Sequence, residues 1–182
     1  MSQKLTTAEM GRLSAEAYRA ADKVSLTVVL DNVRSQHNVG AVFRTADAMR
    51  IEGVWLCGIC CCPPNDEIHK TALGAEETVE WRDFKDTLEA VRQLKEAGYT
   101  VYAVEQAHDS ITLEEATKSL TGGAGHDRIA IILGHEVFGV QQEVVDLCDG
   151  CIEIPQYGTK HSLNVSVAAG IVIYRLSEAL RC

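Results

Sequence analysis

Two uninterrupted apolar runs of strand length constrain the fold of this chain more than any other feature. They occupy residues 25–30, with the sequence SLTVVL, and residues 128–133, with the sequence RIAIIL. A strand with one face in water alternates apolar and polar residues, whereas a continuous apolar run is typical of a strand buried on both faces in a parallel sheet. The two runs therefore predict the centre of a sheet that is covered on both sides.

The remaining segments alternate between strand-like and helix-like patterns. Shorter strands are expected at residues 53–59, 78–81, 99–104 and 151–154, and amphipathic helices at residues 39–49, 84–97, 141–148 and about 165–180. A short helix is expected within residues 65–77, and a flexible glycine-rich turn at residues 121–125. Strands that alternate with helices in this way predict an α/β fold, with an open, largely parallel sheet and helices on both faces.

The domain organisation is simple. A chain of 182 residues is long enough for one domain with a core, and residues 23–182 contain no composition break or internal repeat. Residues 1–22 are expected to form an N-terminal helical arm. In this arm Thr6 and Glu9 have the spacing of a capping box that opens a helix running to about Ala21, with Leu13 and Ala17 on one face.

The net charge of −9 and the isoelectric point near 5.1 argue against a generally basic nucleic-acid binder. A local basic site is still open, because several cations fall in or beside the polar loops. We select these candidates for nucleic-acid contacts: Arg34, His37, Arg44, Lys70 and Lys160. So few phosphate contacts predict weak nucleic-acid binding unless shape or a cofactor contributes.

Seven cysteines occur without a secretory signal, and no apolar run reaches the length of a membrane span. An odd number of cysteines in such a chain predicts a reduced, cytoplasmic protein with free thiols and no membrane partner. The pairs Cys57/Cys60 and Cys148/Cys151 have the internal spacing of zinc knuckles, but the two pairs are far apart and lie in or against strands. We therefore expect no metal.

The stretch from Ile152 to Ala169 joins a strand to a helix through a polar loop. Pro155 ends the strand, Gly158 permits a tight backbone, and either Ser162 or Asn164 can cap the helix that follows. The spacing predicts that this helix buries the following stripe: Ala168, Ile171, Val172, Leu176, Ala179 and Leu180. Such a loop, with helix-start amides beside it, can hold a polar or anionic ligand.

Two other polar loops follow the two long apolar runs. After the first, Asn38 is expected to cap a helix whose buried face is Val42, Phe43, Ala46 and Met49, with Arg44 on the opposite side. After the second run, Gly134 and Gly139 bracket Glu136. In open α/β sheets, ligands bind at this carboxyl edge of the strands.

Three segments now stand in one order along the chain: Asn38-Val39-Gly40 with Arg44, Leu133-Gly134-His135-Glu136 with Gly139, and Ile154-Pro155 continuing to Ser162-Leu163-Asn164. Together they resemble the three signature motifs of the SpoU (TrmH) family of S-adenosylmethionine-dependent RNA ribose 2'-O-methyltransferases, in the SPOUT superfamily. The resemblance covers residues 25–180. It implies a C-terminal trefoil knot, a homodimer, a bent S-adenosylmethionine in the knotted loops, and transfer RNA or ribosomal RNA as substrate.

The resemblance also implies roles for residues that match the motifs. The cofactor would be held near Leu133, Gly134, Glu136, Gly139, Ile154, Gln156, Ser162 and Leu163. Catalysis and organisation of the site would involve Asn38, Arg44, Glu136, Ser162 and Asn164. Because the pKa of arginine is very high, Arg44 fits a phosphate clamp better than a general base, with Glu136 orienting Arg44 or Asn38.

Two other functions remain open from the sequence. One is a non-catalytic RNA-binding or ribosome-assembly module that has kept the fold. The other is a base methyltransferase of the same superfamily. Retention of Asn38, Arg44, Glu136 and Asn164 speaks against the first, and the Ser162-Leu163-Asn164 motif points to ribose instead of base.

Overall fold

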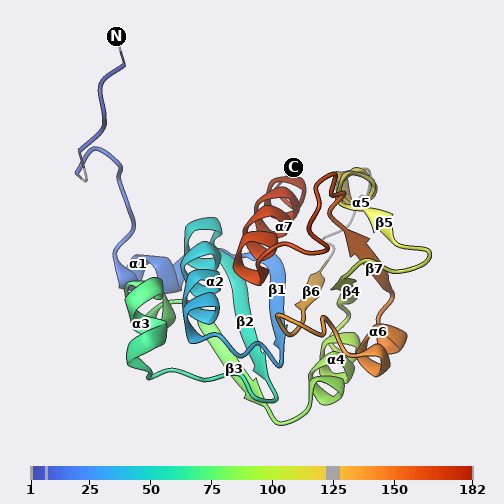
Figure 1. The fold of residues 1–182 in the computed structure, drawn as a ribbon. Coiled ribbons are helices and arrows are strands. Elements are labelled where there is room, and N and C mark those ends of the chain that lie inside the picture. The colour runs from blue at the N-terminus through green and yellow to red at the C-terminus, as the bar shows by residue number, and fades with distance from the viewer. Residues whose placement is uncertain (1, 7, 122–127, 182) are drawn as a thin grey trace.

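A seven-stranded sheet forms the centre of the molecule. The structure, a computed structural model, describes residues 2–6, 8–121 and 128–181. The strand order is β3-β2-β1-β6-β4-β7-β5, and every strand pairing in the described residues is parallel (Figure 1). The predicted parallel α/β sheet is thus confirmed.

The strands are β1 Val24–Asp31, β2 Ile51–Cys57, β3 Glu80–Phe84, β4 Thr100–Val104, β5 Ile111–Thr112, β6 Ile129–Leu133 and β7 Gly150–Glu153. The α-helices are α1 Ala15–Ala20, α2 Gln36–Met49, α3 Asp66–Ala72, α4 Thr87–Glu96, α5 Leu113–Thr121, α6 Gln142–Leu147 and α7 Val165–Ala179, and the 3-10 helix η1 spans Ala75–Glu77. The glycine-rich turn expected at residues 121–125 falls, after Thr121, outside the described residues.

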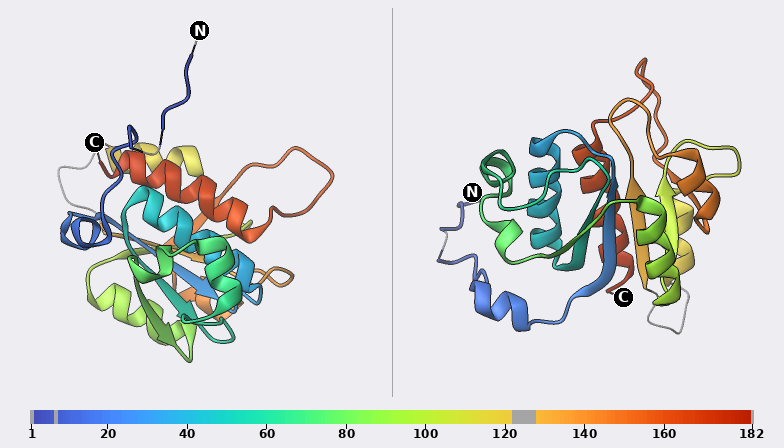
Figure 2. Two further views of the ribbon diagram at one scale, coloured as in Figure 1. Left: turned by 90° about the vertical axis from the view of Figure 1, so that its left-hand side faces the viewer. Right: turned by 90° about the horizontal axis from the view of Figure 1, so that it is seen from below.

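The two central strands are buried on both faces, as their continuous apolar runs predict. Val28 and Ile131 pair in register and belong to one core cluster, whereas their neighbours Val29 and Ile132 belong to the other. Helices α2 and α7 pack together over the first face, with α3 against α2 and α5 against α7. Helices α4 and α6 cover the second face, and the two layers lie on opposite sides of the sheet (Figure 2).

The N-terminal arm contains less helix than the capping box predicts. Thr6 and Glu9 do form the expected contact, with the Thr6 amide 2.7 Å from a Glu9 carboxylate oxygen, but the turn ends at Gly11, which has a φ of +57°. A new helix, α1, begins after Ser14, whose hydroxyl accepts from the Ala17 amide. The prediction of one helix running from about residue 6 to about residue 21 is therefore wrong for the residues before Ala15. Leu13, in this part of the arm, is exposed. The described residues before α1 extend away from the sheet (Figure 1).

One strand and one helix were missed. The short edge strand β5 leads directly into α5, which packs against α7. The sequence does contain a signal, because Thr112 and Glu115 form a capping box in which the Thr112 hydroxyl lies 2.7 Å from the Glu115 carboxylate. The Glu115 amide in turn donates to the Thr112 hydroxyl at 3.2 Å.

Two apolar residues that were assigned to the buried faces of predicted helices have different positions in the structure. Phe84 ends strand β3 instead of starting a helix, and its ring stacks on Trp55 with the centroids 4.8 Å apart. Asp86 then caps α4 by accepting from the Leu88 amide. In α7, Ile171 is 37% exposed although it was predicted to be buried, because the buried stripe is centred on Ala169, Val172, Ile173 and Leu176.

Gly40 allows α2 and α3 to approach closely. A Cβ atom added at Gly40 would lie 2.1 Å from the Thr71 hydroxyl oxygen and 2.3 Å from the Ile68 carbonyl oxygen. One of these neighbours is backbone and cannot rotate away. This contact holds α3, which carries Lys70, beside the helix that carries Asn38 and Arg44.

We predict that Gly40→Ala lowers the free energy of unfolding by about 1–3 kcal/mol, because the added methyl group overpacks the α2–α3 contact. Urea denaturation measures the change. The control is Gly158→Ala in the exposed loop before α7, where nothing lies within 4 Å of the added Cβ, so that stability should be unchanged or rise by up to about 1 kcal/mol. A Gly40→Ala variant as stable as the unchanged protein would contradict the close approach.

Candidate active site at the carboxyl edge of the sheet

Three polar loops meet where strands β1, β6 and β7 end. They are residues 32–35, 134–141 and 154–164, and they correspond to the three loops selected from the sequence. Because all strands are parallel, their carboxyl ends lie at one edge of the sheet, where ligands bind in open α/β folds. The third loop projects from the body before it enters α7 (Figure 2).

The Glu136 carboxylate ties the first two loops together. One oxygen accepts from the Ser35 amide at 2.9 Å and from Nδ2 of Asn38 at 3.1 Å, and the other accepts from the Arg34 amide at 3.1 Å. Burial disfavours the charged form of Glu136. Hydrogen bonds from the Ser35 and Arg34 amides, its own amide and Asn38 outweigh that effect, so the pKa of Glu136 is lowered.

Asn38 extends this network to the third loop. Its Oδ1 accepts from Nδ2 of Asn164 at 3.2 Å, and Oδ1 of Asn164 accepts from the amides of Ser166 and Val167 at the start of α7. Asn164 is therefore the helix cap, one of the two candidates from the sequence. One residue from each motif, Asn38, Glu136 and Asn164, is joined in a continuous hydrogen-bonded chain.

Asn38 itself is not a helix cap, contrary to the sequence prediction. Helix α2 starts three residues earlier than predicted, at Gln36, and Ser35 occupies the cap position with its hydroxyl 3.4 Å from the Asn38 amide. Because Ser35 takes the capping role, the Asn38 side chain is available to contact Glu136 and Asn164. Asn38 is nine-tenths buried, which makes these contacts energetically important.

A cavity of about 1230 Å³ lies among the loops after β4, β6 and β7. It is lined by every residue expected to hold a cofactor, namely Leu133, Gly134, Glu136, Gly139, Ile154, Gln156, Ser162 and Leu163. Asn164 lines it as well. Gly134 is required beside the cavity, because a Cβ there would lie 2.1 Å from the Val140 amide nitrogen.

Arg44 lies apart from this cavity. It lines a second, more open cavity of about 590 Å³ with Lys70 and Thr71, between α2 and α3. The six residues from Asn38 to Arg44 correspond to about 9 Å along the helix axis. Of the two contacts proposed for Glu136 from the sequence, the structure contains the one with Asn38, and Arg44 is placed beside Lys70 instead.

The other candidate RNA-binding cations are placed differently from one another. Arg34 is exposed beside the Glu136 network, and Lys160 is exposed in the third loop. His37 and Lys70 both pair with Glu67, with Nε2 of His37 at 3.0 Å and Nζ of Lys70 at 2.5 Å from its two oxygens. Hydrogen bonds from Lys70 and His37 lower the pKa of Glu67.

Sequence analysis missed two acidic residues of this edge. Asp31 is fully buried and accepts from the Thr87 hydroxyl at 2.6 Å and from the backbone and side-chain nitrogens of Gln141 at 3.1 and 2.9 Å. Glu105 lines the main cavity and accepts from the Val140 amide at 3.2 Å. The available signal was their position, since each is an acid at the end of a predicted buried strand.

The environment of Cys60 is that of a buried structural thiol and differs from that of a metal ligand. Cys60 donates its thiol to the Leu30 carbonyl oxygen at 3.2 Å and accepts from the Val33 amide at 3.1 Å. Burial raises the pKa of the Cys60 thiol to about 12, which opposes the thiolate form that zinc requires. The six cysteines in the described part of the chain are all free.

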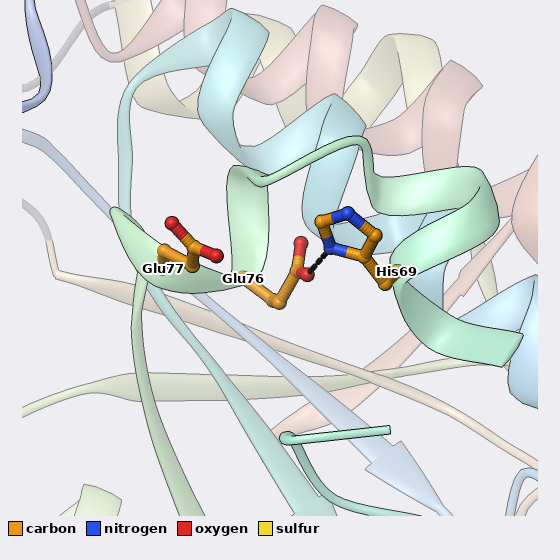
Figure 3. A group of neighbouring side chains, drawn as sticks. All are labelled: His69, Glu76 and Glu77. Carbon is orange, nitrogen blue, oxygen red and sulfur yellow. Dashed lines mark hydrogen bonds and ion pairs between the residues drawn. The ribbon is translucent and has the colours of Figure 1, made fainter. Parts of the chain in front are cut away.

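Within the described residues, one group of side chains has the donor atoms for a metal ion: His69 of α3 with Glu76 and Glu77 of η1, whose ligand atoms lie within 4.8 Å of one another. The His69 and Glu76 side chains point toward each other, with Nδ1 2.5 Å from Oε1 (Figure 3). Two ligands of a tetrahedral zinc ion lie roughly 3.3 Å apart, so this contact is an ion pair between neighbouring elements. The absence of a metal site stays a prediction.

Comparisons with known proteins agree with this geometry. Residues 25–174 match the model of the SpoU rRNA Methylase family. A tRNA (guanosine(18)-2'-O)-methyltransferase from Thermus thermophilus is 36% identical over 149 residues, which cover 82% of this chain and 72% of that enzyme. A 23S rRNA (guanosine-2'-O-)-methyltransferase from Neisseria meningitidis is 33% identical over 156 residues, covering 86% of this chain and 58% of the relative.

Solved structures show the same fold. The TrmH/SpoU tRNA modifying enzyme of A. aeolicus superposes with a TM-score of 0.77 at 25% identity, over 91% of this chain and 81% of that one. An AdoMet-bound rRNA methyltransferase from Sinorhizobium meliloti superposes with a TM-score of 0.75 at 26% identity, over 88% and 59% of the two chains. This chain thus spans most of some relatives and little more than half of others.

We predict that Glu136→Gln lowers the free energy of unfolding by about 1–2 kcal/mol at pH 7, because Gln offers one neutral acceptor in place of a carboxylate. The pKa of Glu136 is lowered in the folded state, so its contribution is fully present above the unfolded value of 4.5 and is lost as the pH falls through the folded pKa. The stability difference from the unchanged protein should therefore shrink below pH 4.5. Chemical denaturation at several pH values measures it.

The matched control is Glu143→Gln, which makes the same change at an exposed residue in the first turn of α6. This variant should be close to the unchanged protein at every pH. An equal effect of the two substitutions would show that the Glu136 hydrogen bonds contribute no stability of their own.

Proposed function

The chain belongs to the SpoU rRNA methylase family, and from this membership we propose that it transfers a methyl group from S-adenosylmethionine to a ribose 2'-hydroxyl of structured RNA. Transfer RNA and ribosomal RNA are both candidate substrates, since the relatives named above act on one or the other. The observation that carries the proposal is the chain of hydrogen bonds through Glu136, Asn38 and Asn164, which brings one residue of each motif together at the rim of the main cavity.

The main cavity suits S-adenosylmethionine in size and lining. Its volume of about 1230 Å³ accommodates a ligand of that size, and Leu133, Ile154 and Leu163 offer apolar surface beside the polar side chains of Gln156 and Ser162. Carboxylates also line it, which favours a ligand with a positive sulfonium centre. When bound, S-adenosylmethionine supplies an electrophilic methyl group.

The side chains of this site have two tasks, which are to orient the ribose and to favour loss of its proton. Glu136 accepts from Nδ2 of Asn38, which fixes the direction of the Asn38 amide and, through it, Asn164. Ser162 is exposed at the cavity and offers a hydroxyl to the ribose or the cofactor. We assign Arg44 to the phosphate next to the reacting nucleotide, because guanidinium does not release its proton and Arg44 lies in the neighbouring cavity with Lys70.

RNA would then lie across the two cavities. Arg34 and Lys160 are exposed beside the main cavity, and His37, Lys70 and Arg44 lie along α2 and α3. Phosphate could replace the Glu67 carboxylate as the partner of His37 and Lys70, because exposed ion pairs contribute little stability.

A homodimer is part of the same proposal. Helix α7 carries an exposed apolar stripe on the face opposite its buried residues: Val167 is 50%, Ile171 37% and Tyr174 51% exposed. These residues are spaced by four and three positions, so they form one face of the helix, and an apolar face of this kind is typical of a protein contact.

Three further features are proposed by family likeness. They are a C-terminal trefoil knot involving the loops around β6 and β7, a single methyltransferase domain at residues 23–182 with an arm at residues 1–22, and a cytoplasmic location, which the free cysteines favour. An experimental density map that traces residues 129–165 would test the knot. No helix in the described part of the chain is long and apolar enough to cross a membrane.

Labelled methyl transfer tests the activity. We expect the chain to move the methyl group of S-adenosylmethionine onto unmodified tRNA or 23S rRNA transcripts. Alkaline hydrolysis should then release the label in dinucleotides, since cleavage needs a free 2'-hydroxyl. Arg44→Ala should lower turnover at saturating RNA by about 100-fold, and Arg44→Lys, which keeps the charge but loses the planar fork, should restore part of it.

The other outcomes identify the alternatives. Label released in mononucleotides would indicate a base methyltransferase. RNA binding without cofactor binding in calorimetry would indicate a non-catalytic module. Unchanged turnover of Arg44→Ala would remove Arg44 from the mechanism and leave the activity standing.

Ile171→Asp tests the dimer, because it places a charge in the exposed stripe of α7. We expect light scattering to show a dimer for the unchanged protein and a monomer for this variant. The matched control is Ile59→Asp, which makes the same substitution at another exposed isoleucine, 58% accessible and outside the stripe. A monomeric unchanged protein would contradict the proposed contact.

A further inference from the structure

An exposed aromatic ring stands on the loop that joins β6 to α6. Phe138 is 83% exposed, and its neighbour Val137 is 72% exposed. Single exposed apolar side chains are common on protein surfaces, so exposure alone carries no functional meaning. Two further observations suggest that the Phe138 ring contacts a ligand: the loop fixes the position of the ring, and the ring lies beside the main cavity.

The loop fixes Phe138 in a defined position. His135 and Gly139 exchange two backbone hydrogen bonds of 3.0 and 2.9 Å, which close the loop, and Nδ1 of His135 accepts from the Val137 amide at 3.0 Å. The Phe138 ring lies against the His135 ring, with centroids 5.0 Å apart and the planes inclined by 32°. At Gly139 the φ is +69°, a left-handed backbone conformation that favours glycine.

The same loop contributes to the active site from its other side. Glu136 binds the amides of Arg34 and Ser35, so the loop is anchored to the start of α2, while Phe138 lines the main cavity. The cavity volume of about 1230 Å³ exceeds the roughly 300–1,000 Å³ of ordinary small-molecule sites, which leaves room for part of a nucleotide. A ribose that reaches this cavity brings its base, and those of the adjoining nucleotides, to the rim where Phe138 stands.

The negative charge of the chain favours an uncharged contact with RNA over a contact with phosphates. With a net charge of −9, and with His37 and Lys70 already paired with Glu67, the surface offers little general attraction for phosphates. Stacking of a base on an aromatic ring needs no net charge and accepts any of the four bases.

We propose that Phe138 is a stacking site for a nucleobase of the RNA strand that enters the main cavity. The proposal rests on the proposed RNA methyltransferase function and adds a base contact to it. His135 is then a positioning residue, because it holds the ring through ring contact and through the Val137 amide.

Methyl-transfer kinetics with tRNA and 23S rRNA transcripts test the proposal. Phe138→Ala should raise the KM for RNA about tenfold, with a smaller effect on kcat at saturating RNA. Phe138→Trp, which keeps an aromatic face, should stay within about twofold of the unchanged protein. The control Val137→Ala removes a neighbouring exposed apolar side chain without removing a ring, and should change KM less than about twofold.

Ultraviolet cross-linking to the same transcripts gives a readout that does not depend on turnover. Trypsin should release a peptide spanning residues 129–160 with a nucleotide attached at Phe138. If no methyl is transferred but this cross-link forms, the proposed function fails and the base contact stands. If methyl transfer occurs, Phe138→Ala keeps its KM and no cross-link maps to this loop, the stacking site is wrong and the function stands.

Light scattering distinguishes base stacking from a second explanation for the exposed ring, which is a contact between two copies of the chain. If Phe138→Ala converts a dimer into a monomer, the ring is covered by a second copy of the chain, and the stacking proposal is overturned. An unchanged oligomeric state together with the raised KM supports it.

Discussion

The arrangement of the site depends on the hydrogen bonds that the Glu136 carboxylate accepts. It accepts hydrogen bonds from residues about a hundred positions earlier in the chain, and it fixes which way the Asn38 amide points. With Nδ2 of Asn38 directed to Glu136, Oδ1 must face Asn164, and Oδ1 of Asn164 must then cap α7. Donors and acceptors alternate along the whole chain of contacts, so the charge on Glu136 sets the orientation of side chains from three separate motifs.

A second buried carboxylate supports the other side of the same edge. Asp31 ends β1 and is fully buried, yet it accepts from Thr87 at the start of α4 and from Gln141 immediately before α6. A polar side chain buried in such a place is tolerated only when its oxygens are hydrogen-bonded. Asp31 therefore fixes two helix starts against the strand. It also positions the far end of the loop that carries Glu136, so that the two carboxylates hold this loop at both ends.

The sequence predicted the parts of this structure that depend on local pattern. The runs around Val28 and Ile131 were uniformly apolar because both faces are covered. The eight expected cofactor residues came instead from the resemblance to the SpoU family; the structure places all eight around one cavity, and their role stays a prediction. Helix starts were less predictable, because Ser35 and Asn38 are both good caps and only the tertiary contact with Glu136 decides between them. The exposure of Ile171 could not be predicted for a similar reason, since α7 has apolar residues on two opposite faces and helical spacing alone does not say which face is buried.

The RNA contacts proposed for this acidic chain depend on a few local basic side chains, two of which are paired with one carboxylate. Glu67 pairs with His37 and Lys70 on the surface of α2 and α3, and both pairs are exposed and easily exchanged. Because both side chains are already paired, we expect them to attract phosphate weakly and non-specific binding along an RNA backbone to be poor. A substrate whose backbone reaches His37, Lys70 and Arg44 while its ribose enters the main cavity would engage all of them at once. Local charge of this kind, on a chain of net negative charge, favours discrimination between RNAs over general affinity for them.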